Sequence, residues 1–380
     1  MSVQKKGNLW YVVLEERDLE TGKRMQRWVP TGSSRKRDAL DQETMLRAQQ
    51  LRGVHVVPSA DSLSRFLTDE WLPSIRTTIR PATYQSYEQI VRTQAIPRIG
   101  AAKLKTITPV MLNRMYGELL DRGRLDGNGG LSPKSVRNIH VVLHKALGDA
   151  VRWDKLARNP ADLADPPKAA RREINVWSPA QLATFLHHVQ GHRLFAAFRL
   201  MAMTGMRRGE LLGLRWSDVD LTVDRLSVQQ TLLSVNYEQI ISEPKTAKGR
   251  RSVQLDHQTA STLKRHRKQQ LEERMVAGEL WEETESVFTD EFGHPIHPDR
   301  FTKLFVALVE AAGIERLTPH GLRHTYATLA LQARANPKVV SDRLGHANVS
   351  TTLQIYSHVT PAVEQGLADT VARLVDGESR

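Results

Sequence analysis

The chain has 380 residues, of which 40% are apolar and 25% charged, and its formal net charge is +12. This length suggests two or three domains with cores of their own, and the absence of cysteine excludes a disulfide framework, a thiolate zinc site and a cysteine nucleophile. The sequence has no run of about 20 apolar residues and no secretory apolar stretch at its start, so we expect a cytoplasmic protein without a membrane span.

The positive charge is concentrated in the first part of the chain. Residues 1–172 hold 30 Lys and Arg against 18 Asp and Glu, whereas residues 173–380 hold 24 of each kind. This asymmetry favours a front portion that binds a polyanion and a back portion with another specialisation. Ordinary solubility charge is the alternative.

Residues 1–57 predict a small basic module made of a β-hairpin or sheet followed by a helix. The runs 9–14 and 25–29 are typical of strands and are separated by turn residues at 20–23, and a helix is expected over 37–51. Such sheets can enter a major groove, so the DNA-binding candidates here are Lys5, Lys23, Arg24 and Arg27. A structural cap with solvated lysines is the alternative.

Residues 61–165 predict an all-helical domain that follows a linker at 53–60. Apolar spacing and capping residues indicate helices over 62–71, 83–94 and 108–122, with a fourth that begins at Ser132-Pro133. The fourth helix has a polar face on which the DNA-binding candidates are Lys134, Arg137 and Lys145.

A second linker, rich in proline and charge, covers residues 159–172, and a third domain is expected over 174–380. It is mainly helical from Ser178 onward, with predicted strands at 226–232, 239–241 and 251–255. The predicted fold class is therefore mainly α with small β elements.

Two segments of the third domain carry arginines suited to an anionic ligand. One helix ends near Gly205 and another begins near Arg207, so Arg207 can point into a cleft while Glu210 holds that region; a buried Arg207–Glu210 pair between helices is the alternative. His320 and Arg323 are three residues apart and share a helix face. Such donors are expected around a phosphodiester, whose negative charge grows when a nucleophile attacks it.

Three further residues complete a candidate set. Lys245 lies in a polar turn between two predicted strands, with Lys248 as a competitor for the same role. His346 follows Leu344-Gly345, and Tyr356 comes ten residues later. The set in chain order is Arg207, Lys245, His320, Arg323, His346 and Tyr356.

These segments resemble the motifs of tyrosine recombinases, the phage-integrase family. The resemblance rests on Thr-Gly-x-Arg-x-x-Glu-x-x-x-Leu-x-Trp-x-Asp at 204–218, on His-x-x-Arg-His at 320–324, and on Leu-Gly-His at 344–346 before Tyr356. It implies an arm-site-binding module at the front, a helical core-binding domain and a catalytic domain, in a mobile-element or phage integrase.

The resemblance also implies a mechanism and partners. Tyr356 would attack the scissile phosphorus to form a 3′-phosphotyrosine, Arg207 and Arg323 would bind non-bridging oxygens, and Lys245 would protonate the leaving 5′ oxygen. His320 would assist proton transfer and His346 would donate a hydrogen bond to the phosphate. The expected partners are double-stranded attachment sites of core and arm type, three further copies in a tetramer that forms a Holliday junction, a host DNA-bending protein and an excision factor. Neither a metal nor another cofactor is implied.

The tail, residues 361–375, has an apolar stripe at helical spacing. The family resemblance implies that this stripe docks on a neighbouring protomer. The alternative is that it packs on its own domain.

Several other functions stay open at this level. A transposon recombinase, a type IB topoisomerase and a non-catalytic DNA-binding regulator are the rivals. His187, His188 and His192 suggest a metal only weakly, and the rival nucleophiles Tyr84, Tyr87, Tyr116 and Tyr326 lack the Leu-Gly-His segment.

Overall fold

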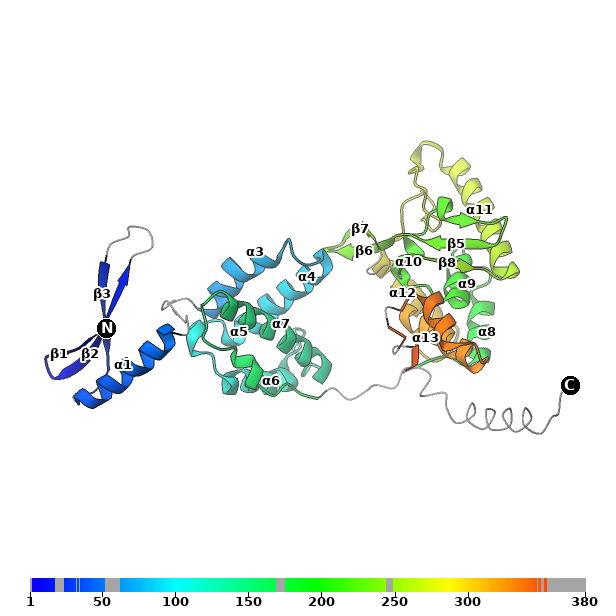
Figure 1. Ribbon diagram of the computed structural model, residues 1–380. Coiled ribbons are helices and arrows are strands. Elements are labelled where there is room, and N and C mark those ends of the chain that lie inside the picture. Colours follow the sequence, from blue (N-terminus) through cyan, green and yellow to red (C-terminus); the bar gives the residue numbers. More distant parts are fainter. Residues whose placement is uncertain are drawn as a thin grey trace, which may run out of the picture. The chain divides into compact units, whose positions relative to one another are not determined.

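The structure, a computed structural model, describes residues 2–17, 24–31, 33, 35–51, 62–168, 175–243, 249–346, 348, 349, 352 and 353. The chain divides into two compact units, Met1–Ala170 and Arg171–Arg380, and helices predominate over small antiparallel sheets (Figure 1). The predicted fold class is confirmed.

The first unit begins with a three-stranded antiparallel sheet and a helix. The strands β1 (Ser2–Lys6), β2 (Leu9–Arg17) and β3 (Arg24–Pro30) lie in that order, and α1 (Lys36–Leu51) follows them. Val12 and Val13 of β2 are buried, as is Ala39 of α1. The sequence did not predict β1 as a separate strand, although Gly7, with φ at +64°, supplies the turn residue that joins it to β2.

The rest of the first unit is helical, as predicted. Its elements are α2 (Leu63–Arg65), η1 (Phe66–Trp71), α3 (Leu72–Ile75), α4 (Pro81–Ile90), η2 (Val91–Ala95), α5 (Ile96–Ile99), η3 (Leu104–Thr106), α6 (Pro109–Arg122), α7 (Pro133–Arg152) and η4 (Pro160–Leu163).

Two of these helices extend further than the sequence predicted. The predicted ends at Trp71 and Gln94 lie just before Pro73 and Pro97, residues that lack the N–H needed to continue a helical ladder. In both places a wide π-type turn, η1 or η2, precedes the proline, and the helix continues to Ile75 or Ile99.

The core of this helical part contains a tryptophan tied to a buried carboxylate. Trp71 is fully buried, its Nε1 donates to Asp149 Oδ2 at 2.8 Å, and its ring stacks on Tyr87. Lys145 and Arg152 balance the charge of Asp149. This pairing fixes α7, which carries the polar face, against η1.

The second unit contains two small sheets among helices. Its elements are α8 (Pro179–His188), α9 (Phe195–Thr204), α10 (Arg208–Leu212), η5 (Trp216–Asp218), β4 (Val219–Asp220), β5 (Arg225–Val228), β6 (Thr231–Val235), β7 (Glu238–Ser242), β8 (Arg251–Gln254), α11 (His257–Ala277), η7 (Gly278–Leu280), α12 (Pro298–Ala311), α13 (Pro319–Gln332) and α14 (Pro337–Leu344). One sheet has the order β4-β5-β8, and β6 pairs with β7.

The single strand predicted over 226–232 is two strands, β5 and β6, in different sheets. The chain leaves the first sheet at Gln229-Gln230, where the side chain of Gln230 donates to the carbonyl of Gly213 at 2.9 Å. A side-chain anchor of this kind leaves no periodic signal in the sequence, so the break was not predictable.

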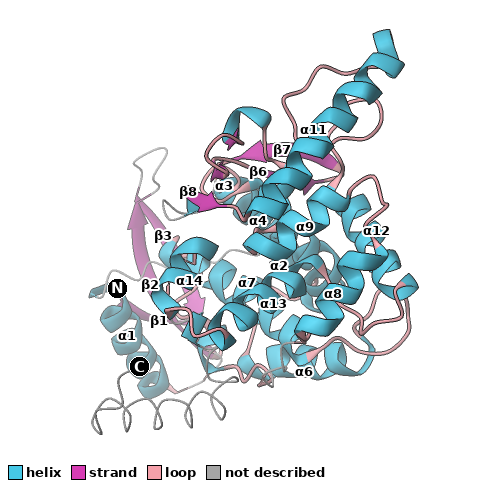
Figure 2. Ribbon diagram, turned by 90° about the vertical axis from the view of Figure 1, so that its right-hand side faces the viewer, coloured by secondary structure: helices cyan, strands magenta, loops and turns pink. Residues whose placement is uncertain are grey.

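An aromatic cluster of Trp177, Phe185, Phe198 and Phe305 fills the core of the second unit. Helix α13 packs beside α9 and against α14 (Figure 2), so the end of α9, the start of α10 and the end of α14 lie around one face of α13. None of the helices described is both long and apolar enough to cross a membrane.

Candidate active site

Arg207 stands in the tight connection between α9 and α10. Helix α9 ends at Thr204, and Gly205 takes a left-handed conformation with φ at +64°. A Cβ atom on Gly205 would lie 2.5 Å from Leu344 Cδ2 and 2.8 Å from Tyr326 Cδ1, so only glycine fits this close approach. The turn sets Arg207 at the first position before α10.

Glu210 holds Arg207 in place. Arg207 Nη1 donates to Glu210 Oε1 at 2.7 Å, and the Arg207 backbone N–H donates to Oε2 at 2.9 Å. Arg207 Nη2 also donates to the carbonyl of Gly345 at 3.1 Å. Glu210 is only 4% exposed, whereas the Arg207 side chain is 41% exposed, so its guanidinium can reach a ligand.

Arg323, on α13, is buried beside Arg207. Its Nη1 donates to the carbonyl of Gly205 and its Nη2 to the carbonyl of Leu344, both at 2.8 Å. Burial and the nearby charge of Arg207 lower the pKa of Arg323 to about 9, so the guanidinium remains protonated at neutral pH. Two of its five N–H donors fix its plane, and the fork can present others to an anion.

His346 lies in the turn that ends α14. Gly345 takes the left-handed conformation, and the backbone N–H of His346 donates to the carbonyl of Ser341 at 3.0 Å. His346 Nδ1 lies 2.8 Å from the hydroxyl of Thr352, which is fully buried. Burial and the positive charges of Arg323 and Arg207 lower the pKa of His346 to about 4, so its imidazole is neutral at pH 7.

His320 and His324 form a pair on the first turns of α13. Their ring centroids are 4.6 Å apart in an edge-to-face arrangement. Burial, followed by the charges of Arg323 and Arg207, lowers the pKa of His320. Burial, His320 and Arg323 lower the pKa of His324 to about 4. Both rings therefore favour the neutral form that can accept or donate a single proton.

The structure thus brings together four of the six predicted residues, Arg207, His320, Arg323 and His346. They come from the α9–α10 turn, from α13 and from the end of α14, and the two arginines donate to the backbone of the opposite segment. Two fixed guanidinium groups and two neutral imidazoles in one place are suited to a tetrahedral oxyanion.

Two residues of this site were not predicted. Arg251, at the start of β8, donates to both oxygens of Glu210, and His324 packs on His320. For His324 the spacing of four residues from His320 was an available signal. Arg251 gave none, because its partner is 41 residues away in the sequence.

Comparison with known proteins places this chain in a family. A model of the phage integrase family matches residues 177–362, and a model of the phage integrase N-terminal SAM-like domain matches residues 65–120. A "Tyrosine recombinase XerC-like" protein of Caldanaerobacter subterraneus is 31% identical over 80% of this chain and 81% of that protein. The chain belongs to the phage integrase family. It is a tyrosine-type site-specific DNA recombinase.

Other relatives extend over nearly the whole recombinase. The ICEBs1 integrase of Bacillus subtilis is 26% identical over 93% of this chain and 94% of that protein. The fold is shared with a Tn1549 transposon integrase in complex with transposon right end DNA (TM-score 0.69, 22% identity, 82% of this chain and 99% of that one). It is also shared with a lambda integrase tetramer bound to a Holliday junction (TM-score 0.58, 16% identity, covering 91% of this chain and 95% of that one).

The two remaining residues of the predicted set, Lys245 and Tyr356, lie outside the described residues, as do Lys248 and residues 361–375. The described chain ends on one side of Lys245 at Glu243 and resumes at Gly249, just before Arg251. On the approach to Tyr356 it includes Thr352, the partner of His346. The roles of these residues in the recombinase therefore stay predictions.

The DNA-binding candidates of the helical part differ in exposure. Lys134 and Arg137 are exposed on the first turns of α7. Lys145 is partly buried, and its Nζ lies 3.4 Å from Asp149 Oδ2, where it helps to balance that buried carboxylate. Lys134 and Arg137 are therefore better placed to contact a phosphate than Lys145.

In the front module only part of the candidate set can be placed. Lys5 is exposed on β1, Arg24 and Arg27 belong to β3, and Lys23 lies outside the described residues. The role of this sheet in DNA binding by the recombinase stays a prediction.

The rival tyrosines of the helical part serve its core. Tyr116 is buried, its hydroxyl lies 2.8 Å from His140 Nδ1, and burial raises its pKa well above the ordinary value, which makes it a poor nucleophile. Tyr87 stacks on Trp71, and Tyr84 packs against the same core. Tyr326, in the second unit, packs on Gly205 and under the guanidinium of Arg343.

The three candidate metal-binding histidines do not lie together around one point. His187 and His188 are exposed at the end of α8. His192 accepts a hydrogen bond from the backbone N–H of Leu194 at 3.0 Å, and its ring contacts Phe198. Among the residues that the structure describes, no group of three or more His, Asp or Glu side chains is arranged to hold a metal ion.

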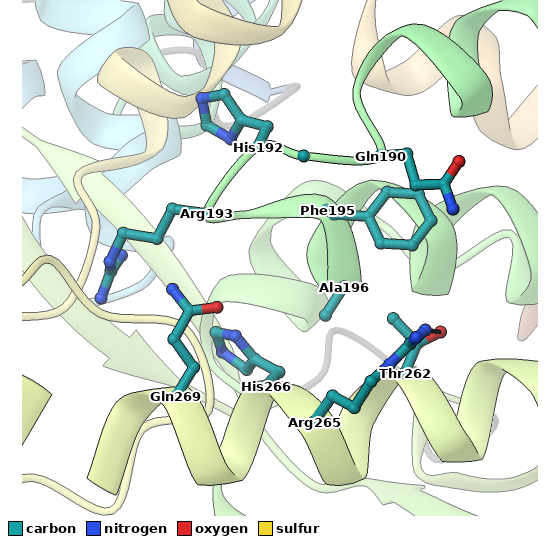
Figure 3. A pocket seen from close by; sticks show the side chains of 10 residues that line it. Gln190, His192, Arg193, Phe195, Ala196, Thr262, Arg265, His266 and Gln269 are labelled. Carbon is teal, nitrogen blue, oxygen red and sulfur yellow. Dashed lines mark hydrogen bonds between the residues drawn. The ribbon is translucent and has the colours of Figure 1, made fainter. Parts of the chain in front are cut away.

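A separate hollow of about 420 Å³ lies between residues 190–196 and helix α11 (Figure 3). It contains none of the predicted site residues. Arg193 at its edge donates to both carboxylate oxygens of Glu273 at 2.8 and 2.6 Å, and to the carbonyls of Thr289 and Asp290 at 2.5 and 2.9 Å. Arg193 is thus a structural clamp, and it has the same kinds of partner as Arg251.

The depressed histidine pKa values predict that the folded recombinase is destabilised by mild acid. His346 has a pKa of about 4 in the folded state against an ordinary value of 6.5, so the unfolded chain binds the extra proton between these pH values. The stability from His346 is present above pH 6.5 and is lost as the pH falls toward 4, by about 2 kcal/mol between pH 7 and pH 5.

Urea unfolding of the full chain at several pH values measures this effect. We expect His346→Asn to flatten the dependence of the free energy of unfolding on pH between 7 and 5. His188→Asn, on the exposed end of α8, should leave the dependence as it is in the wild type. Equal slopes in the wild type and His346→Asn would contradict the prediction.

Proposed function

We propose that this recombinase cleaves and rejoins duplex DNA through Tyr356, with Arg207, His320, Arg323, His346 and Lys245 as the supporting set. The observation that carries the proposal is the convergence of four of these residues around the Gly205 and Gly345 turns. The front module (1–57) would bind arm-type sites, the helical domain (61–165) core sites, and residues 174–380 would form the catalytic domain.

The proposed cleavage step conserves the bond energy of the DNA. The Tyr356 oxygen forms a bond to phosphorus, the bond from phosphorus to O5′ breaks, and the products are a 3′-phosphotyrosine and a free 5′-hydroxyl. Lys245 gives its proton to O5′, and the proton of the tyrosine passes to the neutral ring of His320. A 5′-hydroxyl from the partner duplex reverses the reaction, which yields a Holliday junction after one pair of exchanges.

The remaining residues stabilise the pentavalent transition state. Arg207 and Arg323 donate to the non-bridging oxygens, where the charge increases, and they are held in advance by Glu210 and by backbone carbonyls. His346 is neutral and its Nδ1 is paired with the Thr352 hydroxyl. In the tautomer in which this hydroxyl donates to Nδ1, Nε2–H is the donor that His346 offers to the phosphate.

The relatives support a mobile element as the context. The protein named ICEBs1 integrase shares the length of this chain, and the one named Tn1549 transposon integrase shares its fold. Integration and excision on DNA would then take a homotetramer, with residues 361–375 docked on a neighbouring protomer, and a host DNA-bending protein and an excision factor as accessory partners.

Capture of the covalent intermediate tests the proposal. Purified full-length protein is mixed with sheared DNA of the genome that encodes it, denatured with detergent, and recovered with any bound DNA. We expect adducts at one short sequence, with blocked 3′ ends and free 5′-hydroxyls, and peptide mapping that places the nucleotide on Tyr356. Adducts with blocked 5′ ends, or no adducts, would refute it, and relaxation of any supercoiled plasmid would indicate a topoisomerase instead.

A further inference from the structure

Arg251 is buried at the centre of the candidate active site, although no step of the proposed reaction uses it. Its side chain is 6% exposed. Nη1 and Nη2 donate to Glu210 Oε1 and Oε2 at 3.1 and 2.8 Å, and Nε donates to the carbonyl of Arg343 at 2.6 Å. Nη1 also donates to the carbonyl of Gly249 at 3.2 Å. A guanidinium that directs four of its five N–H donors at protein groups is suited to fixing neighbours rather than to binding substrate.

The carboxylate of Glu210 is shared between two guanidinium groups. Oε1 accepts from Arg207 Nη1 and Arg251 Nη1, and Oε2 accepts from the Arg207 backbone and from Arg251 Nη2. Burial opposes ionisation of Glu210, but the hydrogen bonds and charges of Arg251 and Arg207 outweigh it and lower the Glu210 pKa. Without Arg251, this one buried carboxylate would neutralise Arg207, the cation that faces the ligand.

Arg251 also joins the segments that carry the other predicted residues. It is the first residue of β8, two positions after the described chain resumes beyond Lys245. Through Arg343 it contacts the last turn of α14, which leads to His346, and through Glu210 it contacts Arg207. A shift of β8 would therefore move the Arg207 side and the His346 side of the site together.

We propose that Arg251 is a positioning residue of the recombinase, which balances Glu210 so that Arg207 keeps its full charge and orientation toward the scissile phosphate. The inference rests on the proposed function, since it concerns the same phosphate site. Arg251 itself does not touch the DNA, so it should affect the cleavage rate far more than the affinity for DNA.

The test compares two arginines that make the same kinds of contact. Arg193 makes the same kind of bidentate contact, with Glu273, and also donates to two backbone carbonyls, but it lies at the hollow beside α11. The single-turnover cleavage rate at saturating DNA and the Kd for uncut duplex are measured for Arg251→Met, Arg251→Lys and Arg193→Met, each at a temperature where thermal melting shows the chain folded. The substrate is a nicked duplex that carries the sequence recovered from the wild-type adducts.

We expect Arg251→Met to reduce the cleavage rate about 50-fold, the scale of loss that a small misplacement of a reacting group causes, with the Kd within about threefold. Arg251→Lys, which retains the charge but not the planar fork of donors, should cleave about tenfold faster than Arg251→Met. Arg193→Met should lower the melting temperature but leave the cleavage rate of the folded protein within about threefold of the wild type.

A double variant separates charge balance from mere packing. If Arg251 balances Glu210, Glu210→Gln combined with Arg251→Met should cleave about fivefold faster than Arg251→Met alone, because the unbalanced carboxylate is gone.

Several outcomes would overturn the inference. They are cleavage by Arg251→Met within threefold of the wild type, an equal loss in Arg193→Met, and no recovery in the double variant. If Arg251→Met does not fold, an Arg251→Lys variant that cleaves at the wild-type rate would overturn the inference as well. A wild-type chain that forms no adduct at all would instead refute the proposed function.

Discussion

Replacement of Tyr356 by phenylalanine is expected to reduce the rate at which the recombinase joins covalently to DNA by at least about four orders of magnitude. Losses of this size are typical when an enzyme loses its nucleophile. Phenylalanine retains the ring and removes only the oxygen that would bond to phosphorus, so duplex affinity should stay within about threefold. The measurement is single-turnover adduct formation on a nicked duplex that carries the cleavage sequence.

The matched control for this variant is Tyr237→Phe. Tyr237 is 89% exposed, between β6 and β7 of the same unit, and the change should leave the rate as in the wild type. Undiminished adduct formation by Tyr356→Phe would show that another oxygen is the nucleophile, and peptide mapping of that adduct would identify it.

The second large effect is expected for Arg323→Met. The substitution removes a buried guanidinium that is aimed by the carbonyls of Gly205 and Leu344 and that would neutralise transition-state charge. Loss of one preorganised oxyanion donor costs about 10²–10³ in rate, and a charged fork should cost at least the upper end of that range. We expect cleavage to fall about 10³-fold or more, with Kd much less affected.

Arg208→Met provides the comparison for Arg323→Met. Arg208 follows Arg207 directly, but its Nη1 donates to Pro298 and Thr302 of helix α12, away from the site. Its removal should leave cleavage by the folded chain within about threefold of the wild type. If the two variants lost activity equally, general destabilisation would explain both losses, and Arg323 would have no specific role in cleavage.

The sequence predicted much of this site because its chemistry is local. Arg207 and Glu210 are three residues apart, as are His320 and Arg323, so a single helical turn presents each pair together. The structure adds what the spacing could not supply, namely that Gly205 and Gly345 bring the two pairs to one place through their backbone carbonyls.

Other features were hidden for identifiable reasons. Arg251 meets Glu210 only through the fold of the sheet, and a four-residue strand is too short for alternation to mark its buried face. The helices that pass Pro73 and Pro97 depend on wide turns, which the proline signal masks. Tyr356 and Lys245, the two residues with the most direct proposed roles, were predicted from the sequence alone.

The contact between His346 and Thr352 limits how far Tyr356 can lie from His346 of its own subunit. Thr352 is anchored in the interior of its own subunit, and Tyr356 follows it by four residues. Because a chain extends at most about 3.5 Å per residue, the two Cα atoms are within about 14 Å of each other. Under the proposed function, a tether this short favours attack by Tyr356 on the phosphate that its own subunit binds.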